Sequence, residues 1–168
     1  MKRLIALSLL SGLLINCNKK TETETPAPVT DSTEFNTEAV VDTLGPKSFC
    51  YMGTVGKDSI YASIDDNLGT ITGKLAYKNS EKDSSKGDLS GFKSGDTLKL
   101  TYEFESEGTK SKRDIFFIQK DNTLVEGIGN SKPDETGHVK YTDEKKISYK
   151  DGTKLETADC KIIMEALK

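Results

Sequence analysis

From Ser48 onward, apolar and polar residues alternate in short runs separated by turn-forming residues. In the clearest run, Leu98, Leu100, Tyr102 and Phe104 alternate with polar neighbours, as in a strand with one face in a core. Gly, Asp, Asn, Ser or Lys interrupts the runs roughly every ten residues, which is typical of antiparallel sheets. The strands predicted on this basis are Ser48–Val55, Asp58–Asp65, Thr70–Lys78, Gly87–Phe92, Thr97–Glu105, Lys112–Lys120 and Thr123–Gly129.

The C-terminal part is less regular. Two weaker strands are predicted, at Lys145–Lys150 and Lys154–Thr157. The last segment fits two structures, because Cys160, Ile162 and Met164 alternate as in a strand, whereas Cys160, Ile163, Met164 and Leu167 share one face of a short helix. We favour the strand, since a disulfide from Cys160 would place it near the first strand.

The turns and internal glycines indicate how the strands are connected. Asp65–Gly69 and Lys120–Asn122 contain residues that suit hairpin reversals. Gly73 and Gly91 lie inside predicted strands, where glycine permits sharp coiling or a bulge. No crossover helix is evident. The predicted fold class is all-β: a single antiparallel meander that forms an up-and-down barrel or a strongly curled sheet.

The start of the chain has a different pattern. Lys2 and Arg3 precede Leu4–Ile15, an apolar run too short to cross a bilayer as a permanent helix. The run ends at Leu14-Ile15-Asn16-Cys17, which resembles the lipobox of bacterial lipoproteins, although Asn16 departs from the usual Gly, Ala or Ser. The resemblance implies cleavage before Cys17 and lipid on its thiol. The alternatives are an ordinary secretory signal and an uncleaved anchor helix, and neither accounts for an apolar run that stops at the cysteine.

These features predict a lipoprotein signal peptide at 1–16, a lipidated N-terminus with a flexible tether at 17–47, and a β-barrel-like domain at 48–168. Loss of residues 1–16 leaves 22 of 24 basic residues against 27 acidic ones and changes the formal charge from −3 to −5. With one His, no Trp and no basic cluster, we expect no nucleic-acid partner. We expect attachment to a membrane of the cell envelope, and Asn18 after the cysteine favours the outer membrane by the resembled family's sorting rule.

The cysteines indicate the same compartment. With Cys17 lipidated, Cys50 and Cys160 remain as an even pair. An oxidising location favours a disulfide between them. This bridge would close a loop of 110 residues, for which the chain-entropy model gives about 4.8 kcal/mol of stabilisation. Two buried free thiols are the alternative.

The segment from Phe49 to Gly129 resembles the small calycin-like barrel domains of uncharacterised bacterial envelope lipoproteins. The motifs that carry this resemblance are Cys50-Tyr51-Met52-Gly53, Lys57-Asp58-Ser59-Ile60, Thr72-Gly73-Lys74-Leu75-Ala76-Tyr77, Glu81-Lys82-Asp83 and Ser106-Glu107-Gly108. It implies a fold and a location, and it brings no established reaction. Seven aromatic residues are candidates for the barrel interior, where a filled core is favoured over a ligand cavity: Tyr51, Tyr61, Tyr77, Tyr102, Phe104, Phe116 and Phe117.

Motifs with defined chemistry are scarce. His138 lies in the polar stretch Asp134–His138 and is interpreted as part of a solvated loop. A single His and widely spaced cysteines supply no zinc set, and the Asp-Asn turns lack the ligand spacing of calcium loops. No phosphate loop or nucleophile elbow is present. We therefore assign no catalytic residue, metal or cofactor.

One polar group is a candidate site. Tyr77, Glu81 and Asp83 lie at one predicted hairpin, and Glu107 and Arg113 lie near another. Two strands separate these turns, so a meander returns both to the same rim. The group is a possible ligand or partner rim, but charged hairpins more often pair among themselves, and that interpretation is favoured.

Three functional hypotheses follow. The preferred one is a non-catalytic binding or interaction module that offers the barrel mouth to a small molecule or an envelope protein. The second is a structural or stress-related envelope accessory that contacts another protein. The third is a hydrolase that uses Glu81, Asp83 or Glu107 with Arg113, for which the carboxyl separation is not readable from sequence.

Overall fold

The computed structural model describes residues 45–168. The predicted signal peptide, Cys17 and nearly all of the predicted tether lie outside these residues. The elements along the described chain are β1 Lys47–Val55, β2 Asp58–Asn67, β3 Thr70–Lys78, β4 Ser85–Ser94, β5 Thr97–Ser106, β6 Thr109–Lys120, β7 Thr123–Glu126, β8 Ser131–Pro133, β9 Val139–Tyr141, the 3₁₀ helix η1 Glu144–Lys146, β10 Lys154–Thr157 and the helix α1 Cys160–Ala166.

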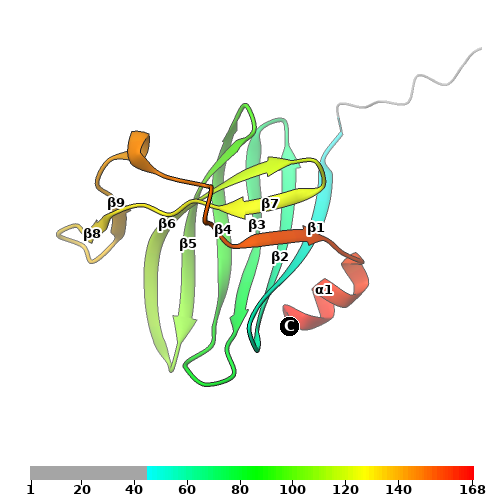
Figure 1. The fold of residues 1–168 in the computed structure, drawn as a ribbon, viewed down its shortest axis with the longest axis horizontal. Helices are drawn as coiled ribbons and strands as arrows, with labels where there is room; N and C mark the ends of the chain where they lie inside the picture. The colour runs from blue at the N-terminus through cyan, green and yellow to red at the C-terminus, as the bar shows by residue number, and fades with distance from the viewer. Residues whose placement is uncertain (1–44) are drawn as a thin grey trace, which may run out of the picture. The chain divides into compact units, whose positions relative to one another are not determined.

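The strands close into a barrel (Figure 1). Strands β1 to β7 follow one another as antiparallel hairpins, and β10 lies between β7 and β1. Pairing of β5 with β6 along ten residue pairs is part of the continuous ring. The predicted all-β antiparallel meander and barrel are therefore confirmed. The final closing strand, β10, is reached only after an excursion through β8, β9 and η1.

The two ends of the barrel differ. We call the end where β1 begins the proximal end; the hairpins β2–β3, β4–β5 and β6–β7 also turn there (Figure 1). The opposite, distal end carries the β1–β2, β3–β4 and β5–β6 turns. Because β7 and β10 have four residues each, they link β6 to β1 only through Phe117–Lys120 of β6 and through Tyr51 and Met52 of β1. Nearer the distal end, Arg113 of β6 bridges Val139 of β9 instead.

The core fills the barrel interior. Fourteen buried residues form one apolar cluster, with Phe49, Tyr77 and Phe104 packed against it. Leu98, Leu100 and Tyr102 of β5 belong to the cluster, as the alternating pattern predicts. Tyr61 and Phe116 are exceptions among the predicted interior aromatics, because Tyr61 packs with a separate cluster and Phe116 contacts Tyr141 at 5.0 Å between ring centroids.

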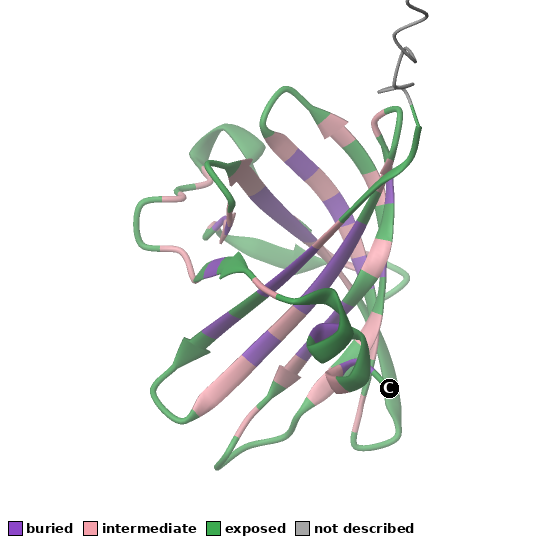
Figure 2. Ribbon diagram, turned by 90° about the vertical axis from the view of Figure 1, so that its right-hand side faces the viewer, coloured by how far each residue is buried: buried purple, intermediate pink, exposed green. Residues whose placement is uncertain are grey.

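That separate cluster fixes the C-terminal segment to the outside of the barrel (Figure 2). Cys50 and Ala76 pack there against Ile163 and Leu167 of the α1 region. The predicted disulfide is confirmed, with Cys50 and Cys160 Cα atoms 5.2 Å apart. It joins β1 to the first residue of α1.

The predicted C-terminal strand is wrong, because residues Cys160–Ala166 form a helix. Asp159 caps the helix by accepting a hydrogen bond from the Lys161 amide. Helical spacing buries Ile163 and Leu167 together, whereas Ile162 and Met164, which a strand would have buried, are 63% and 47% exposed. A disulfide from Cys160 is compatible with both a strand and a helix, so it does not distinguish between them.

The predicted strand Lys145–Lys150 is also wrong. The segment begins within η1, and Ser148 makes only an isolated bridge to Ile128. Its apolar side chains instead cover a glycine: a Cβ on Gly127 would lie 2.5 Å from Ile147 Cγ2 and 2.8 Å from Tyr149 Cε1. The short strands β8 and β9 were not predicted, because three residues are too few for a periodic signal.

Gly73 shows why glycine lies inside a strand. It pairs with Ile64 of β2 in an unbroken register, so there is no bulge at this position. A Cβ at Gly73 would lie 2.0 Å from the Ser63 carbonyl oxygen. The strands are thus coiled so closely that only glycine fits, which is one of the two roles expected for it.

Candidate functional site

The two predicted rim turns meet at the distal end of the barrel. Ser106 Oγ donates a hydrogen bond to the Ser84 carbonyl oxygen at 3.0 Å. A cleft of about 430 Å³ lies between the turns, lined by Tyr77, Ser85 and Glu107 among others. The register of β3 to β6 thus brings together polar residues that are about thirty positions apart in the chain.

Two of the three rim carboxylates interact with each other, and the third pairs with a lysine. Hydrogen bonding with Asp83 and repulsion between the two carboxyl groups raise the pKa of Glu107. Glu107 also has a positive φ of 48° in its turn. Glu81 points elsewhere and pairs with Lys57 across 3.3 Å, with both side chains about 80% exposed. The rim carboxylates therefore form one mutual pair and one solvated ion pair.

Tyr77 and Arg113 instead belong to a polar triad inside the barrel. Arg113 Nη2 donates to the Tyr77 hydroxyl at 3.1 Å and lies 3.4 Å from Glu126 Oε1. The Tyr77 hydroxyl donates in turn to Glu126 Oε2 at 3.0 Å. Burial, followed by the charge of Glu126, raises the pKa of Tyr77 well above its ordinary value. Tyr77 is therefore a neutral hydrogen-bonding group at physiological pH.

Aromatic rings surround the guanidinium. Its central carbon lies 5.6 Å from the Tyr77 ring and 5.8 Å from the Tyr102 ring, within cation–π range. Tyr102 stacks on Phe104 with centroids 4.7 Å apart, and its hydroxyl donates to the Leu75 carbonyl oxygen at 3.0 Å. Burial lowers the pKa of Arg113, but its interactions with the Tyr77 hydroxyl and with the Glu126 carboxylate outweigh burial and raise it. The guanidinium stays positively charged.

Part of the guanidinium remains available. The Arg113 side chain is 33% exposed, while that of Glu126 is 15% exposed. Among the described residues, Arg113 makes side-chain hydrogen bonds only through Nη2. An arginine side chain has five N–H groups in a fixed fork. Its Nη1 and Nε groups therefore have no hydrogen-bond partner among the described protein groups.

Glu126 was missing from the sequence prediction. The signal was present, because Leu124 is buried in the core and a strand returns every second residue to the same face. Glu126 accordingly follows Leu124 into the interior. It was overlooked because charged residues at strand ends are ordinarily assigned to solvent.

The interpretation of His138 as a solvated residue is wrong. Its side chain is 14% exposed, and Nε2 lies 2.8 Å from Asp114 Oδ1. The contact is short but lacks hydrogen-bond alignment, so Nε2 has no hydrogen-bonding partner among the described protein groups. The β8–β9 hairpin folds back on β6 and covers the ring. Tertiary packing alone decides this position, because the local sequence is uniformly polar.

Polar contacts centred on Asp134 stabilise the β8–β9 hairpin. Asp134 Oδ1 accepts from the amide of Thr136, and Asp134 Oδ2 lies 2.8 Å from Lys140 Nζ. Hydrogen bonding to Lys140 and Thr136 lowers the pKa of Asp134 far below its ordinary value.

An outer cleft of about 640 Å³ next to this hairpin is lined by charged residues of β4 to β6, including Lys86, Glu103 and Lys112.

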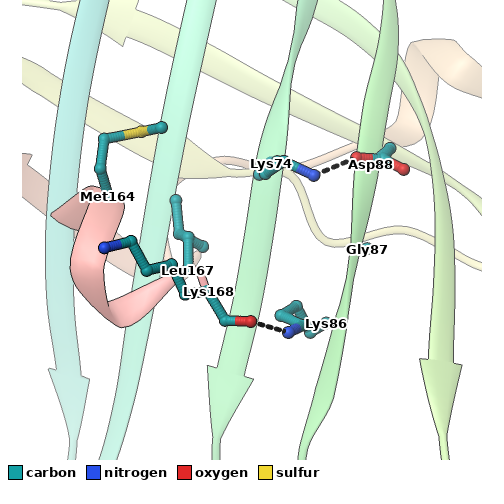
Figure 3. A pocket seen from close by; sticks show the side chains of 7 residues that line it. All are labelled: Lys74, Lys86, Gly87, Asp88, Met164, Leu167 and Lys168. Carbon is teal, nitrogen blue, oxygen red and sulfur yellow. Dashed lines mark hydrogen bonds and ion pairs between the residues drawn. The ribbon is translucent and has the colours of Figure 1, made fainter.

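A further cleft of about 450 Å³ lies between α1 and the outer face of β3 and β4 (Figure 3). Its charged groups already have partners: Lys74 Nζ lies 2.8 Å from Asp88 Oδ1, and Lys86 Nζ donates to the main-chain oxygen of Lys168. Met164 and Leu167 supply its apolar side. With its charges internally paired, this cleft offers less to a ligand than the interior triad does.

The described residues contain no group of three His, Cys, Asp or Glu side chains placed to hold a metal ion. Within residues 45–168, no helix has the length and apolar character needed to cross a bilayer. Comparisons with family models, curated proteins and solved structures gave no match. The fold and the site therefore define a closed antiparallel barrel with an arginine–tyrosine–glutamate triad inside its distal half.

Proposed function

We propose that this protein is a lipid-anchored, non-catalytic binding module of the bacterial cell envelope. The anchoring part rests on the sequence that ends at Cys17, with its basic start and short apolar run. The disulfide between Cys50 and Cys160 supports an oxidising location outside the cytoplasm. The outer membrane is the proposed site of attachment, because Asn18 rather than Asp follows the cysteine.

The binding part rests on one observation, the charged triad in an otherwise apolar interior. Removing a charge from water is costly unless it is paired, and Glu126 pairs with only one edge of the Arg113 guanidinium. The free N–H groups and the surrounding Tyr77 and Tyr102 rings suit a small molecule with an acidic or other hydrogen-bond-accepting group next to an apolar part. We place its polar group at Arg113.

The geometry gives the hydrolase hypothesis no catalytic pair. Glu107 lines the rim cleft, but its carboxyl neighbour is Asp83, whose interaction raises the pKa of Glu107, and Glu81 faces Lys57 on the surface. Arg113 is engaged with Tyr77 and Glu126 rather than with these carboxylates. The accessory hypothesis has the charged outer cleft as a structural candidate, and we treat it as an outcome of the test.

The test is native mass spectrometry of the full chain, extracted from its own envelope in mild detergent. We expect wild type to retain a small molecule that Arg113→Met loses. Lys112→Met is the matched control, since Lys112 neighbours Arg113 on β6 but pairs with Glu103 at the surface. Arg113→Lys keeps the charge and removes the planar fork, so it should also weaken retention. It takes the place of Arg113→Met in the comparison if that variant is unstable.

The possible results separate the hypotheses. A co-purifying protein without a small molecule supports the accessory function instead. Retention that is equal in wild type and in Arg113→Met, or absent from both, refutes the proposed ligand site. Intact mass of the natural protein tests the anchor, because an unacylated N-terminus would contradict it.

A further inference from the structure

The hairpin between β2 and β3 contains an unfavourable residue. Leu68 and Gly69 form its two-residue turn with φ values of 52° and 86°, a geometry that favours Asn-Gly or Asp-Gly. A positive φ is a true outlier for a bulky residue. At the β6–β7 turn, where both φ values are also positive, the chain uses Asp121 and Asn122. Leucine at position 68 is therefore not explained by the turn.

Leu68 is also the most exposed of the large apolar side chains in the described part of the chain, at 74%. Phe92 of β4 is 56% exposed and stands opposite Thr70, the residue that follows the turn. The amide of Lys93 donates to the Gly69 carbonyl oxygen at 2.8 Å, which holds the turn against β4. Two large apolar side chains thus project into solvent at the same corner of the proximal end.

The chain enters the barrel at this end. Lys47, the first residue of β1, pairs with Asp66, two residues before Leu68. The segment between Cys17 and Lys47 therefore joins the barrel at the end that carries Leu68 and Phe92. An anchor at Cys17 keeps this corner within about 100 Å of the membrane, the length of the fully extended segment.

The charge of the proximal end does not favour an acidic partner. Its basic and acidic residues nearly balance and include Lys47, Lys93 and Lys120 with Asp65, Asp66, Asp96 and Asp121. Attraction to anionic lipid requires clustered basic residues, so the exposed apolar side chains, rather than charge, are what this corner offers to a membrane. Leucine and phenylalanine are residues that insert at the boundary between headgroups and acyl chains.

We propose that the proximal end of the barrel rests on the bilayer, with Leu68 and Phe92 inserted at the lipid interface. The proposal rests on the proposed anchor at Cys17. It gives the barrel an orientation: the distal end, with the Arg113 triad, faces away from the membrane and toward dissolved ligands. The lipid interface also accounts for a leucine in a turn that asparagine would fit better.

The absence of tryptophan from the chain makes this testable. Leu68→Trp and Phe92→Trp each introduce one Trp at the proximal end. Val55→Trp is the matched control, because Val55 is 53% exposed in a hairpin at the distal end. The full lipidated variants are reconstituted into phosphatidylcholine vesicles with and without brominated acyl chains. We expect the proximal tryptophans to be blue-shifted and at least about twofold more quenched than Trp emission from the Val55 variant.

Three further results decide the proposal. Equal quenching at the two ends overturns it. Trp emission from the Leu68 variant that is blue-shifted but unquenched also overturns it, and indicates a protein partner or a second copy. Quenching that disappears between 0.1 and 1 M NaCl, an expectation of charge-driven binding, contradicts apolar insertion; quenching that persists supports it.

The anchor is tested separately by flotation of the wild-type chain and of Cys17→Ser with the same vesicles. If wild type floats but the proximal tryptophans are not more strongly quenched than the distal one, only the proposed insertion of Leu68 and Phe92 fails. If wild type does not float, a hexahistidine tag placed before residue 17 attaches the chain to nickel-chelating lipid. The same tryptophan comparison then tests insertion of Leu68 and Phe92 without the natural anchor. Leu68→Asn should fold normally and reduce quenching of the Trp in a Phe92→Trp background.

Discussion

Removal of the Cys50–Cys160 disulfide is the sharpest test of how the barrel is held together. The bridge joins β1 to α1 across 110 residues, nearly the whole folded part of the chain. Constraint of the unfolded chain by a loop of this length is worth about 4.8 kcal/mol in the chain-entropy model. Cys50 is buried and packs against Ile163 and Leu167, so the double variant Cys50→Ala, Cys160→Ala also loses some apolar contact.

Loss of the disulfide also weakens the attachment of helix α1 to the barrel. The helix has seven residues, too few to be stable in isolation, and only Ile163 within it is buried. Without the bridge, docking of Ile163 and Leu167 must hold the helix alone. We expect the free energy of unfolding to fall by about 4 to 5 kcal/mol, which for a domain of this size is a decrease in Tm of about 15 to 20 °C.

The assay is urea unfolding of the full chain, followed by circular dichroism, in a Cys17→Ser background that removes thiol exchange. Wild type in reductant should match the double variant, and the double variant should not respond to reductant. A loss below about 1 kcal/mol would refute the chain-entropy reasoning and would mean that the unfolded chain is already compact. A large loss in the double variant together with a small loss in reduced wild type would assign the effect to packing of Cys50.

Other consequences of the structure are testable by similar means. Gly73→Ala should destabilise the barrel by about 3 kcal/mol in urea unfolding, because its Cβ would meet the carbonyl oxygen of Ser63 on the paired strand; a neutral result would show that β2 and β3 separate easily. Arg113→Met and Glu126→Gln should each cost about 1 to 2 kcal/mol, with the double variant costing less than their sum, since either single change leaves a polar group without its partner; additive values would show no coupling. Glu107 has a folded-state pKa above its unfolded value, so its contribution to stability is greatest at low pH and declines as pH rises above about 4.5. Glu107→Gln should flatten that decline in unfolding curves taken from pH 4 to 7, and an unchanged slope would contradict the assigned interaction.

The barrel was predictable because its strands carry a local signal. Alternation of period two in β5 follows from the requirement that one face be buried, and Gly69 of the β2–β3 turn and Asp121 and Asn122 of the β6–β7 turn suit reversal. The pairing of Cys50 with Cys160 followed from counting thiols in an oxidising location. Neither inference required knowledge of which strands are neighbours.

The errors have a common physical cause. The alternation of Cys160, Ile162 and Met164 is compatible with both a strand and a helix, and the choice depends on which side chains find a partner. Cys50 and Ala76 on the outer wall provide that partner for Ile163 and Leu167. His138 is covered only because β9 pairs with β6 at Arg113, a contact that the local sequence does not encode.

The candidate site divides in the same way. Sequence alone selected Tyr77 and Arg113 and determined that two charged turns would share a rim, because a meander returns alternate turns to the same end. Only the tertiary structure showed that Arg113 turns inward to Tyr77 and Glu126, while Glu107 interacts with Asp83 and Glu81 pairs with Lys57. Periodicity fixes the face of a strand on which a side chain lies, but closure of the barrel decides what that side chain meets across the interior.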